Sequence, residues 1–220
     1  MDAADTEAFY RAYNASRPAD RQHPLNREVL LQRAANEIAL FRVLGAINFD
    51  KDQTVLDVGG GGGGTLVPFV GIGCPALTLT CLDIRDGSAE LAQRLPGVPF
   101  HHCDAQKMPF PDRHFDLVCA FTMFHQLRDD VAAPRIAAEM RRVCRGHIVI
   151  ADWAMAHKGD QAVTLSYVER IFGLKVTHTE RGALAPPLGR RLSRISDAAY
   201  FAVRALFPIA AAGRVYAMKV

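Results

Sequence analysis

Six consecutive glycines, residues 59–64, follow directly on a short apolar segment, residues 54–58, and no other feature constrains the fold as strongly. The apolar segment predicts a buried strand, and glycines after it let the chain turn with positive φ. In an open parallel sheet, the first strand–helix turn is where backbone approaches a ligand beyond the carboxyl ends of the strands. We therefore expect a ligand-binding loop and a helix starting near Thr65; a tight turn without a ligand is the alternative.

Beyond this loop, short apolar strands alternate with helical segments. The expected strands cover residues 54–58, 77–83, 98–102, 115–120, 146–152, 174–179 and 214–220. The expected helices cover residues 5–13, 24–45, 88–95, 131–143 and 160–172. Strands joined through helices pair in parallel, because right-handed crossovers leave a helix on one face of the sheet or the other. The pattern predicts a doubly wound α/β fold of seven strands, preceded by two helices. The second of these helices has an apolar stripe at Leu30, Leu31, Ile38, Phe41 and Leu44.

Residues 183–212 interrupt this alternation before the last strand. They carry a Pro186–Pro187 pair, a basic cluster (Arg190, Arg191 and Arg194) and an apolar, helix-like run over residues 198–206. We interpret the segment as an inserted helical cap. Its basic cluster leaves contact with an anionic membrane surface open, but a solvated helix face is the favoured interpretation.

The charge balance and the cysteines restrict the partners and the compartment. Of 220 residues, 26 are basic and 23 acidic, so the near-balance argues against a dedicated nucleic-acid binder and favours a small-molecule partner. Five cysteines form no C-x-x-C pair, no apolar run is long enough for a membrane span, and the N-terminus is acidic. We expect a cytoplasmic protein with free thiols and no metal site; the oligomeric state is not predicted.

Three carboxylates lie at or near the ends of the first three expected strands. Asp57 lies just before the glycines, where it would disfavour an anionic pyrophosphate and favour a cationic ligand. Asp83 ends the second strand, where a carboxylate accepts hydrogen bonds from both hydroxyls of a ribose, and Asp104 beside Ala105 could accept from an adenine edge. Each alone also fits a turn or a cap. Together they indicate a positively charged nucleoside cofactor.

Three stretches resemble the class I S-adenosylmethionine (SAM)-dependent methyltransferases. Residues 55–63 (VLDVGGGGG) resemble the first motif of that family, and residues 81–85 (CLDIR) resemble the second. Residues 104–118 (DAQKMPFPDRHFDLV) are similar to the run after the third strand in the subgroup of ubiquinone and menaquinone biosynthesis methyltransferases, and the likeness continues to Asp152. At residues 145–147 (RGH) the family commonly has RPGG, so the turn before the fifth strand is shortened here.

The resemblance implies a Rossmann-like sheet with an antiparallel last strand and SAM as methyl donor. The implied cofactor-binding residues are Asp57, Gly59, Gly61, Gly63, Asp83, Ile84, Asp104, Ala105 and Phe121. The resemblance covers about residues 55–152, whereas the length of 220 residues favours one domain, so we expect one methyltransferase domain over residues 1–220. Within it we expect a helical lid (1–50), a cofactor-binding core (51–182), the cap insertion (183–212) and the last strand (213–220).

His125 and Asp152 are the candidate catalytic residues for methyl transfer to a small molecule, most plausibly at oxygen. His125 follows the fourth strand and would act as a base, although a structural role in its loop is the slightly favoured interpretation. Asp152 ends the fifth strand and could equally cap the next turn. A nicotinamide-dependent oxidoreductase and a non-catalytic SAM-binding scaffold protein are the alternatives.

Overall fold

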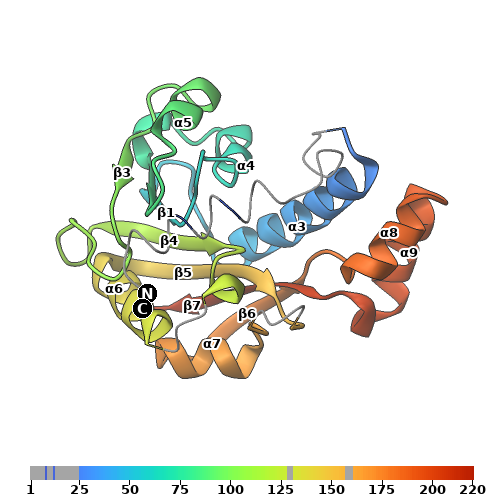
Figure 1. The fold of residues 1–220 in the computed structure, drawn as a ribbon. Coiled ribbons are helices and arrows are strands. Elements are labelled where there is room, and N and C mark those ends of the chain that lie inside the picture. The colour runs from blue at the N-terminus through green and yellow to red at the C-terminus, as the bar shows by residue number, and fades with distance from the viewer. Residues whose placement is uncertain (1–7, 9–11, 13–24, 128–130, 157–160) are drawn as a thin grey trace.

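The computed structural model describes residues 8, 12, 25–127, 131–156 and 161–220, so the expected helix over residues 5–13 lies almost wholly outside it. Within these residues one sheet has the strand order β3-β2-β1-β4-β5-β7-β6 (Figure 1). Its strands are β1 (Val55–Val58), β2 (Leu79–Asp83), β3 (Phe100–His102), β4 (Phe115–Phe121), β5 (Cys144–Trp153), β6 (Val176–Arg181) and β7 (Gly213–Lys219). Strands β1 to β5 pair in parallel, and β7 is antiparallel to β5 and β6. This confirms the predicted doubly wound fold with an antiparallel last strand.

Helices cover both faces of the sheet. They are α3 (Arg27–Ala46), α4 (Val67–Gly71), α5 (Ser88–Arg94), α6 (Ala132–Val143) and α7 (Leu165–Phe172). Two further helices, α8 (Pro186–Ser193) and α9 (Asp197–Leu206), belong to the cap insertion. Figure 1 shows α3, α4 and α5 on one face and α6 and α7 on the other. Alternate strand residues fill two cores, Leu56 and Val118 on the α6 side, and Val55 and Leu117 on the α3 side. No helix in the described part of the chain is long and apolar enough to cross a membrane.

Helix α3 buries a different face from the predicted stripe. The Asn26 side chain accepts a hydrogen bond from the Val29 amide and so caps the helix. Leu30, Ile38 and Phe41 are 43%, 38% and 38% exposed. The buried residues of the helix are Leu31, Ala35, Ala39, Leu40, Val43 and Leu44. The prediction was wrong at Leu30, Ile38 and Phe41 because it followed the large apolar residues. The buried face instead contains small alanines, which allow the helix to approach β6 and β7.

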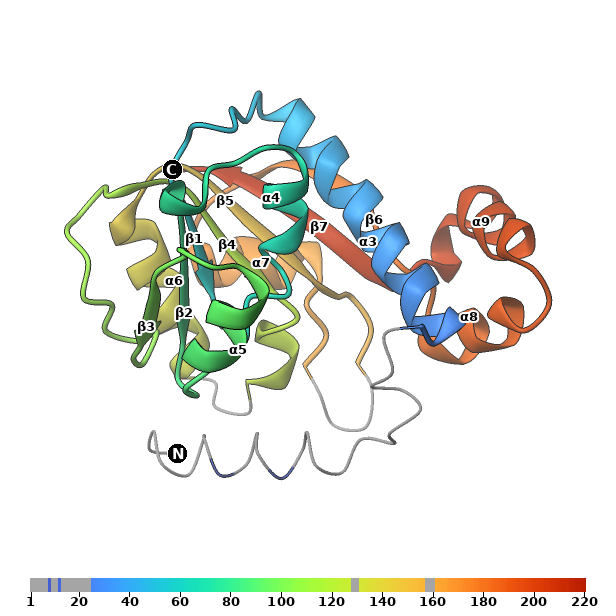
Figure 2. The same cartoon turned by 90° about the horizontal axis from the view of Figure 1, so that it is seen from above.

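The cap insertion consists of two helices, and the sequence predicted only the second. Helix α8 begins at Pro186, and its two prolines occupy the first turn, where a missing N–H costs nothing. Helix α9 starts one residue before the expected run, with Ser196 as its N-cap. In Figure 2 the pair stands beyond one end of α3. Ion pairs join Arg27 to Asp197 at 2.7 Å and Arg190 to Glu28 at 3.3 Å, so both cap helices are tied to α3.

The shortened turn before β5 is a direct passage from helix to strand. Helix α6 ends at Val143 and β5 begins at Cys144. A Cβ atom at Gly146 would lie 2.4 Å from the carbonyl oxygen of Asp116, so only glycine fits this close approach of β5 to β4. Arg145 then makes two hydrogen bonds, of 2.7 and 2.8 Å, to the Asp116 carboxylate.

Candidate active site

The glycine loop adopts a conformation that glycine alone accommodates readily. Gly59, Gly61 and Gly63 have φ angles of 74°, 52° and 73°, so every second residue is left-handed. The amides of Gly59 and Gly60 donate to the carbonyl oxygen of Leu82, at 2.8 and 3.2 Å, which ties the loop to β2. A Cβ at Gly60 would lie 2.3 Å from the Oδ2 atom of Asp57. The loop therefore lies at the carboxyl ends of β1 and β2, where the sequence predicted it.

The helix after the glycine loop starts two residues later than the position near Thr65 that the sequence predicted. Residues 61–66 form turns, and α4 begins at Val67 and spans five residues. The Thr65 hydroxyl donates to the Asp57 carboxylate, so this side chain does not cap the helix. Threonine often caps a helix, but here its hydroxyl group is engaged by the Asp57 carboxylate instead.

Asp57 is fully buried beneath the glycine loop, on the α3 face of the sheet. Burial raises the pKa of Asp57 to about 7 from its ordinary value of 3.8. The hydrogen bond from Thr65 opposes this rise in pKa, and the nearby charge of Asp83 adds to it. At neutral pH the carboxyl group of Asp57 is therefore poised between its neutral and charged forms.

Asp83 links the end of β2 to the glycine loop. Its side chain is 7% exposed; Oδ2 accepts from the Gly61 amide and Oδ1 from the Arg85 amide, each at 2.8 Å. The Arg85 Nε atom lies 3.6 Å from Oδ1. A carboxylate has about four acceptor positions, so these contacts leave capacity for a ligand hydroxyl. Ile84 follows directly, and its carbonyl oxygen lies 2.8 Å from His102 Nε2.

Asp104 holds the turn after β3. Its Oδ1 atom accepts from the Gln106 amide at 2.8 Å, which is the turn-capping alternative raised from the sequence. Ala105 is buried beside it, in the core on the α6 side. Asp83 and Asp104 thus follow neighbouring strands at the same edge of the sheet, since β2 pairs with β3 in parallel.

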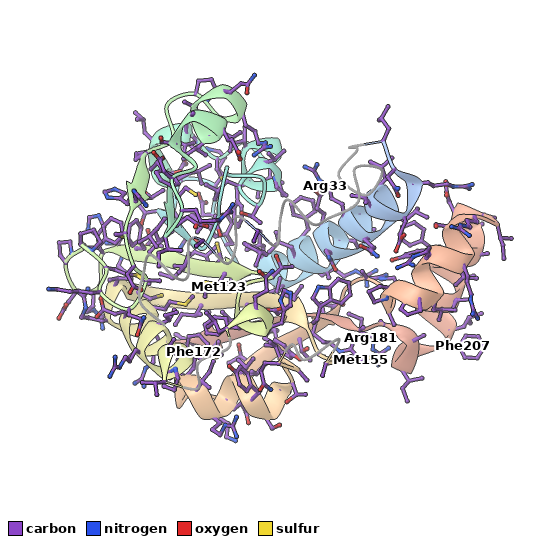
Figure 3. The ribbon with its side chains drawn as sticks, viewed as in Figure 1. Arg33, Met123, Met155, Phe172, Arg181 and Phe207 are labelled. Carbon is purple, nitrogen blue, oxygen red and sulfur yellow. The ribbon has the colours of Figure 1, made fainter. Side chains whose placement is uncertain are left out.

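The backbone is strained directly after β4, next to a residue whose side chain contacts the glycine loop. Thr122 has a φ of 51°, an uncommon conformation for a β-branched residue. It follows Phe121, the partly buried last residue of β4. The next side chain, Met123, lies over Gly59, because a Cβ atom there would be 2.7 Å from its Sδ atom. Figure 3 shows Met123 near the end of β4. The sequence carried no signal for this strain or for this contact.

His125 and Asp152 meet across the ends of β4 and β5. The Nδ1 atom of His125 lies 2.6 Å from Oδ1 of Asp152, within ion-pair distance although not aligned as a hydrogen bond. The Asp152 carboxylate also accepts from the backbone amides of His125, at 3.2 Å, and Trp153, at 2.7 Å. The two side chains are 9% and 0% exposed. Asp152 therefore fixes both the backbone and the ring of His125.

The described residues bring the candidate residues into two groups at one edge of the sheet. Asp57, Asp83 and the glycines form the first group, and His125 with Asp152 forms the second, with Met123 between them. Among the described residues no three His, Cys, Asp or Glu side chains gather in a way that could hold a metal ion.

Comparison with known proteins finds similarity to methyltransferases. Residues 55–147 match the family model described as "Methyltransferase domain". The ubiquinone/menaquinone biosynthesis C-methyltransferase UbiE of Bordetella avium is 31% identical over 122 residues, which cover 52% of this chain and 46% of that protein. The demethylmenaquinone methyltransferase of Renibacterium salmoninarum is 32% identical over 115 residues, 51% of this chain and 46% of that protein. The chain thus spans a little under half the length of either relative.

Two solved structures share the fold at lower identity. Magnesium protoporphyrin IX methyltransferase (ChlM) from Synechocystis has a TM-score of 0.64 and 13% identity, covering 100% of this chain and 97% of that one. The 1,6-didemethyltoxoflavin-N1-methyltransferase of Burkholderia thailandensis has a TM-score of 0.62 and 18% identity, covering 100% and 90%. Residues 55–147 are therefore similar to a methyltransferase domain, and the strand order is that of the class I SAM-dependent methyltransferase fold.

Proposed function

We propose that this chain transfers the methyl group of SAM to the oxygen of a small-molecule acceptor. The observation that carries the proposal is the His125–Asp152 pair, which lies at the same sheet edge as the glycine loop. His125 also follows closely on Met123, whose side chain contacts the glycine loop at Gly59. The relative from Bordetella avium is called a C-methyltransferase, so the acceptor atom is the part of the proposal that needs its own test.

The residues at the loop fit SAM. The left-handed Gly59, Gly61 and Gly63 leave no room for side chains, and backbone can approach the methionine part of the cofactor there. Asp83 has acceptor capacity for the ribose hydroxyls, and Asp104 with Ala105 would lie near the adenine. Ile84 and Phe121 would supply apolar contacts. When bound, SAM supplies an activated methyl group on a sulfonium sulfur.

His125 would remove the proton of the acceptor hydroxyl. Bound SAM would supply the methyl carbon to the acceptor oxygen, and S-adenosylhomocysteine (SAH) would leave with the electron pair of the broken carbon–sulfur bond. The hydroxyl proton passes to Nε2 of His125 and then to solvent. Asp152 touches neither reactant and acts as a positioning residue, because it holds Nδ1 and the backbone of His125. A positioned base contributes about 10²–10⁴-fold to the rate.

Isothermal titration calorimetry with SAH and with NADH tests the cofactor. Binding of SAH without binding of NADH is the expected result; the reverse would indicate a nicotinamide-dependent enzyme. Incubation with methyl-labelled SAM and fractionated metabolites then tests catalysis. Saturable SAH binding without any labelled product would leave a non-catalytic SAM-binding scaffold protein.

Mass spectrometry of the labelled product tests the acceptor atom. An O-methyl product loses its label on ether or ester cleavage, whereas a C-methyl product keeps it and would overturn the oxygen assignment. His125→Asn should lower kcat with little change in the Kd of SAH, because the ring acts on the acceptor. An undiminished kcat would leave His125 with a structural role alone.

Two broader expectations belong to the same proposal. The chain would form one domain, in which residues 51–182 bind the cofactor and residues 1–50 and 183–212 select the acceptor. A cytoplasmic location is supported by the five cysteines, all of which are free.

A further inference from the structure

Three charged residues form a row across β5, β7 and β6 at the carboxyl edge of β5. Asp152 pairs in register with Arg214, and Arg214 pairs in register with Arg181. In-register residues of antiparallel strands lie on the same face of a sheet, so all three face the α6 and α7 side. The row therefore leads outward from the His125–Asp152 pair toward the cap, at the strand end marked by Arg181 in Figure 3.

The two arginines have no acidic partner in the part of the chain that the structure describes. Glu180 is the nearest acidic residue on β6, but strand alternation turns it to the other face, where it lies 3.6 Å from Arg42. Asp152 is already committed to His125 and to the Trp153 amide. Like charges directly opposite each other on neighbouring strands are destabilising. The row thus holds two adjacent positive charges with no neutralising carboxylate among the residues that the structure describes.

Hydrogen bonds hold the side chain of Arg214 and the backbone of Arg181 in place. Arg214 is half-buried, and its Nη1 atom donates to the carbonyl oxygens of Ala211 and Gly213. Its Nε and Nη2 donors have no partner among the described residues. Burial lowers the pKa of Arg214, and the charge of Arg181 lowers it further, so the two guanidinium groups are close enough to interact. Arg204 donates to the carbonyl oxygens of Arg181 and Gly182, which fixes the end of β6.

We propose that Arg181 and Arg214 bind an oxyanion, a carboxylate or a phosphate, carried by the methyl acceptor. An oxyanion would accept from both guanidinium groups and would relieve their repulsion. Neighbouring strands are about 4.8 Å apart, so the anion would lie roughly 5–10 Å from Asp152, which contacts His125; this is about the span of one substituted aromatic ring. The acceptor class is therefore a compact hydroxy acid or hydroxylated phosphate ester. This inference rests on the proposed function.

Calorimetry on the SAH-saturated protein tests the anion site with three probes of one size. The probes are 4-hydroxybenzoate, 4-hydroxyphenyl phosphate and the neutral methyl 4-hydroxybenzoate. The carboxylate or the phosphate should bind at least 10-fold more tightly than the ester, and the tighter of the two identifies the anion. Each of Arg181→Gln and Arg214→Gln should reduce this preference by about 10-fold, as expected for a hydrogen bond between charged groups.

Lys219→Gln is the matched control, because Lys219 is an exposed basic residue at the opposite end of β7 from Arg214. It should keep the preference for the anion. Equal binding or no binding of the three probes, survival of the preference in the Arg181→Gln/Arg214→Gln double variant, or equal loss in Lys219→Gln would overturn the inference. The Kd of SAH separates the two proposals. Intact SAH binding without an anion preference overturns the anion site alone, whereas absence of SAH binding by the wild type overturns the proposed function.

Discussion

Asp83 is the side chain on which the proposed cofactor site depends most. Its carboxylate accepts from Gly61 and Arg85 and has acceptor capacity for a ribose. Asp83→Ala should weaken SAH binding by at least about 10-fold, since hydrogen bonds to a charged group contribute about 1.5–3 kcal/mol. Calorimetry measures the effect, with Asp52→Ala as control, because Asp52 is an exposed carboxylate before β1 at the opposite edge. An unchanged Kd in Asp83→Ala would remove Asp83 from the site.

Thr122 stores backbone strain at the point where β4 leaves the sheet. Its φ of 51° is costly for a β-branched residue and free for glycine. Thr122→Gly should therefore stabilise the fold by about 1 kcal/mol, a rise in Tm of roughly 2–4 °C for a domain of this size. Thermal unfolding measures the change. Thr122→Val keeps the strain and serves as control, so a loss of stability in the glycine variant would show that the strain is not stored there.

Asn36 on α3 holds the point where the cap leaves the sheet. Its Oδ1 atom accepts from the amide of Ala183, a fully buried residue, at 2.8 Å. Asn36→Ala would leave this buried N–H without a partner, which costs about 1–3 kcal/mol of unfolding free energy. Urea unfolding measures the loss. Gln32→Ala is the matched control, because Gln32 bonds within α3 to Glu28 and should change stability little; equal losses would contradict the role of Asn36.

Strands and most helices could be predicted because each carries its own apolar period. Helix α8 could not be predicted, because its two prolines and one glycine have low helix propensity. Its stability comes from packing and from an ion pair to α3. The exposed side of α3 was misjudged for a related reason. Periodicity shows that a helix has an apolar face, whereas the partner strands decide which face is buried.

Hydrogen bonds join the run after β3, within residues 104–118, to helix α6. Arg142 on α6 donates to the carbonyl oxygens of Phe110, at 2.7 Å, and Met108, at 3.0 Å. Glu139 accepts from the Met108 amide at 2.7 Å. The run after β3 and the helix after β4 are therefore one packed unit. The pairing of His125 with Asp152 has the same origin, since only the adjacency of β4 and β5 brings them together.

The pH dependence of stability for the whole molecule should show the buried Asp57. Its folded pKa of about 7 exceeds the ordinary 3.8, so the folded state binds more protons than the unfolded state between these values. Stability from this group is present below the ordinary pKa and is lost as the pH rises through about 7. Each unit of pKa difference corresponds to about 1.4 kcal/mol. Urea unfolding should show wild type losing a few kcal/mol relative to Asp57→Asn between about pH 5 and pH 8.

The chosen pH range avoids a second carboxylate with the opposite effect. The guanidinium of Arg145 holds the pKa of Asp116 well below its ordinary value, so the stability from that pair is present above the ordinary pKa and is lost on acidification. A stability difference between wild type and Asp57→Asn that stays constant from about pH 5 to pH 8 would contradict the raised pKa of Asp57.

Asp57 should also couple cofactor charge to proton release. SAM carries a positive sulfonium, whereas the sulfur of SAH is neutral, and a positive charge near Asp57 favours its ionised form. At pH 7 the binding of SAM should therefore release more protons than the binding of SAH, because part of the Asp57 population is protonated beforehand. Calorimetry in buffers of different ionisation enthalpy measures the released protons. The difference should vanish in Asp57→Asn; equal release for SAM and SAH in wild type would mean that Asp57 does not sense the sulfonium.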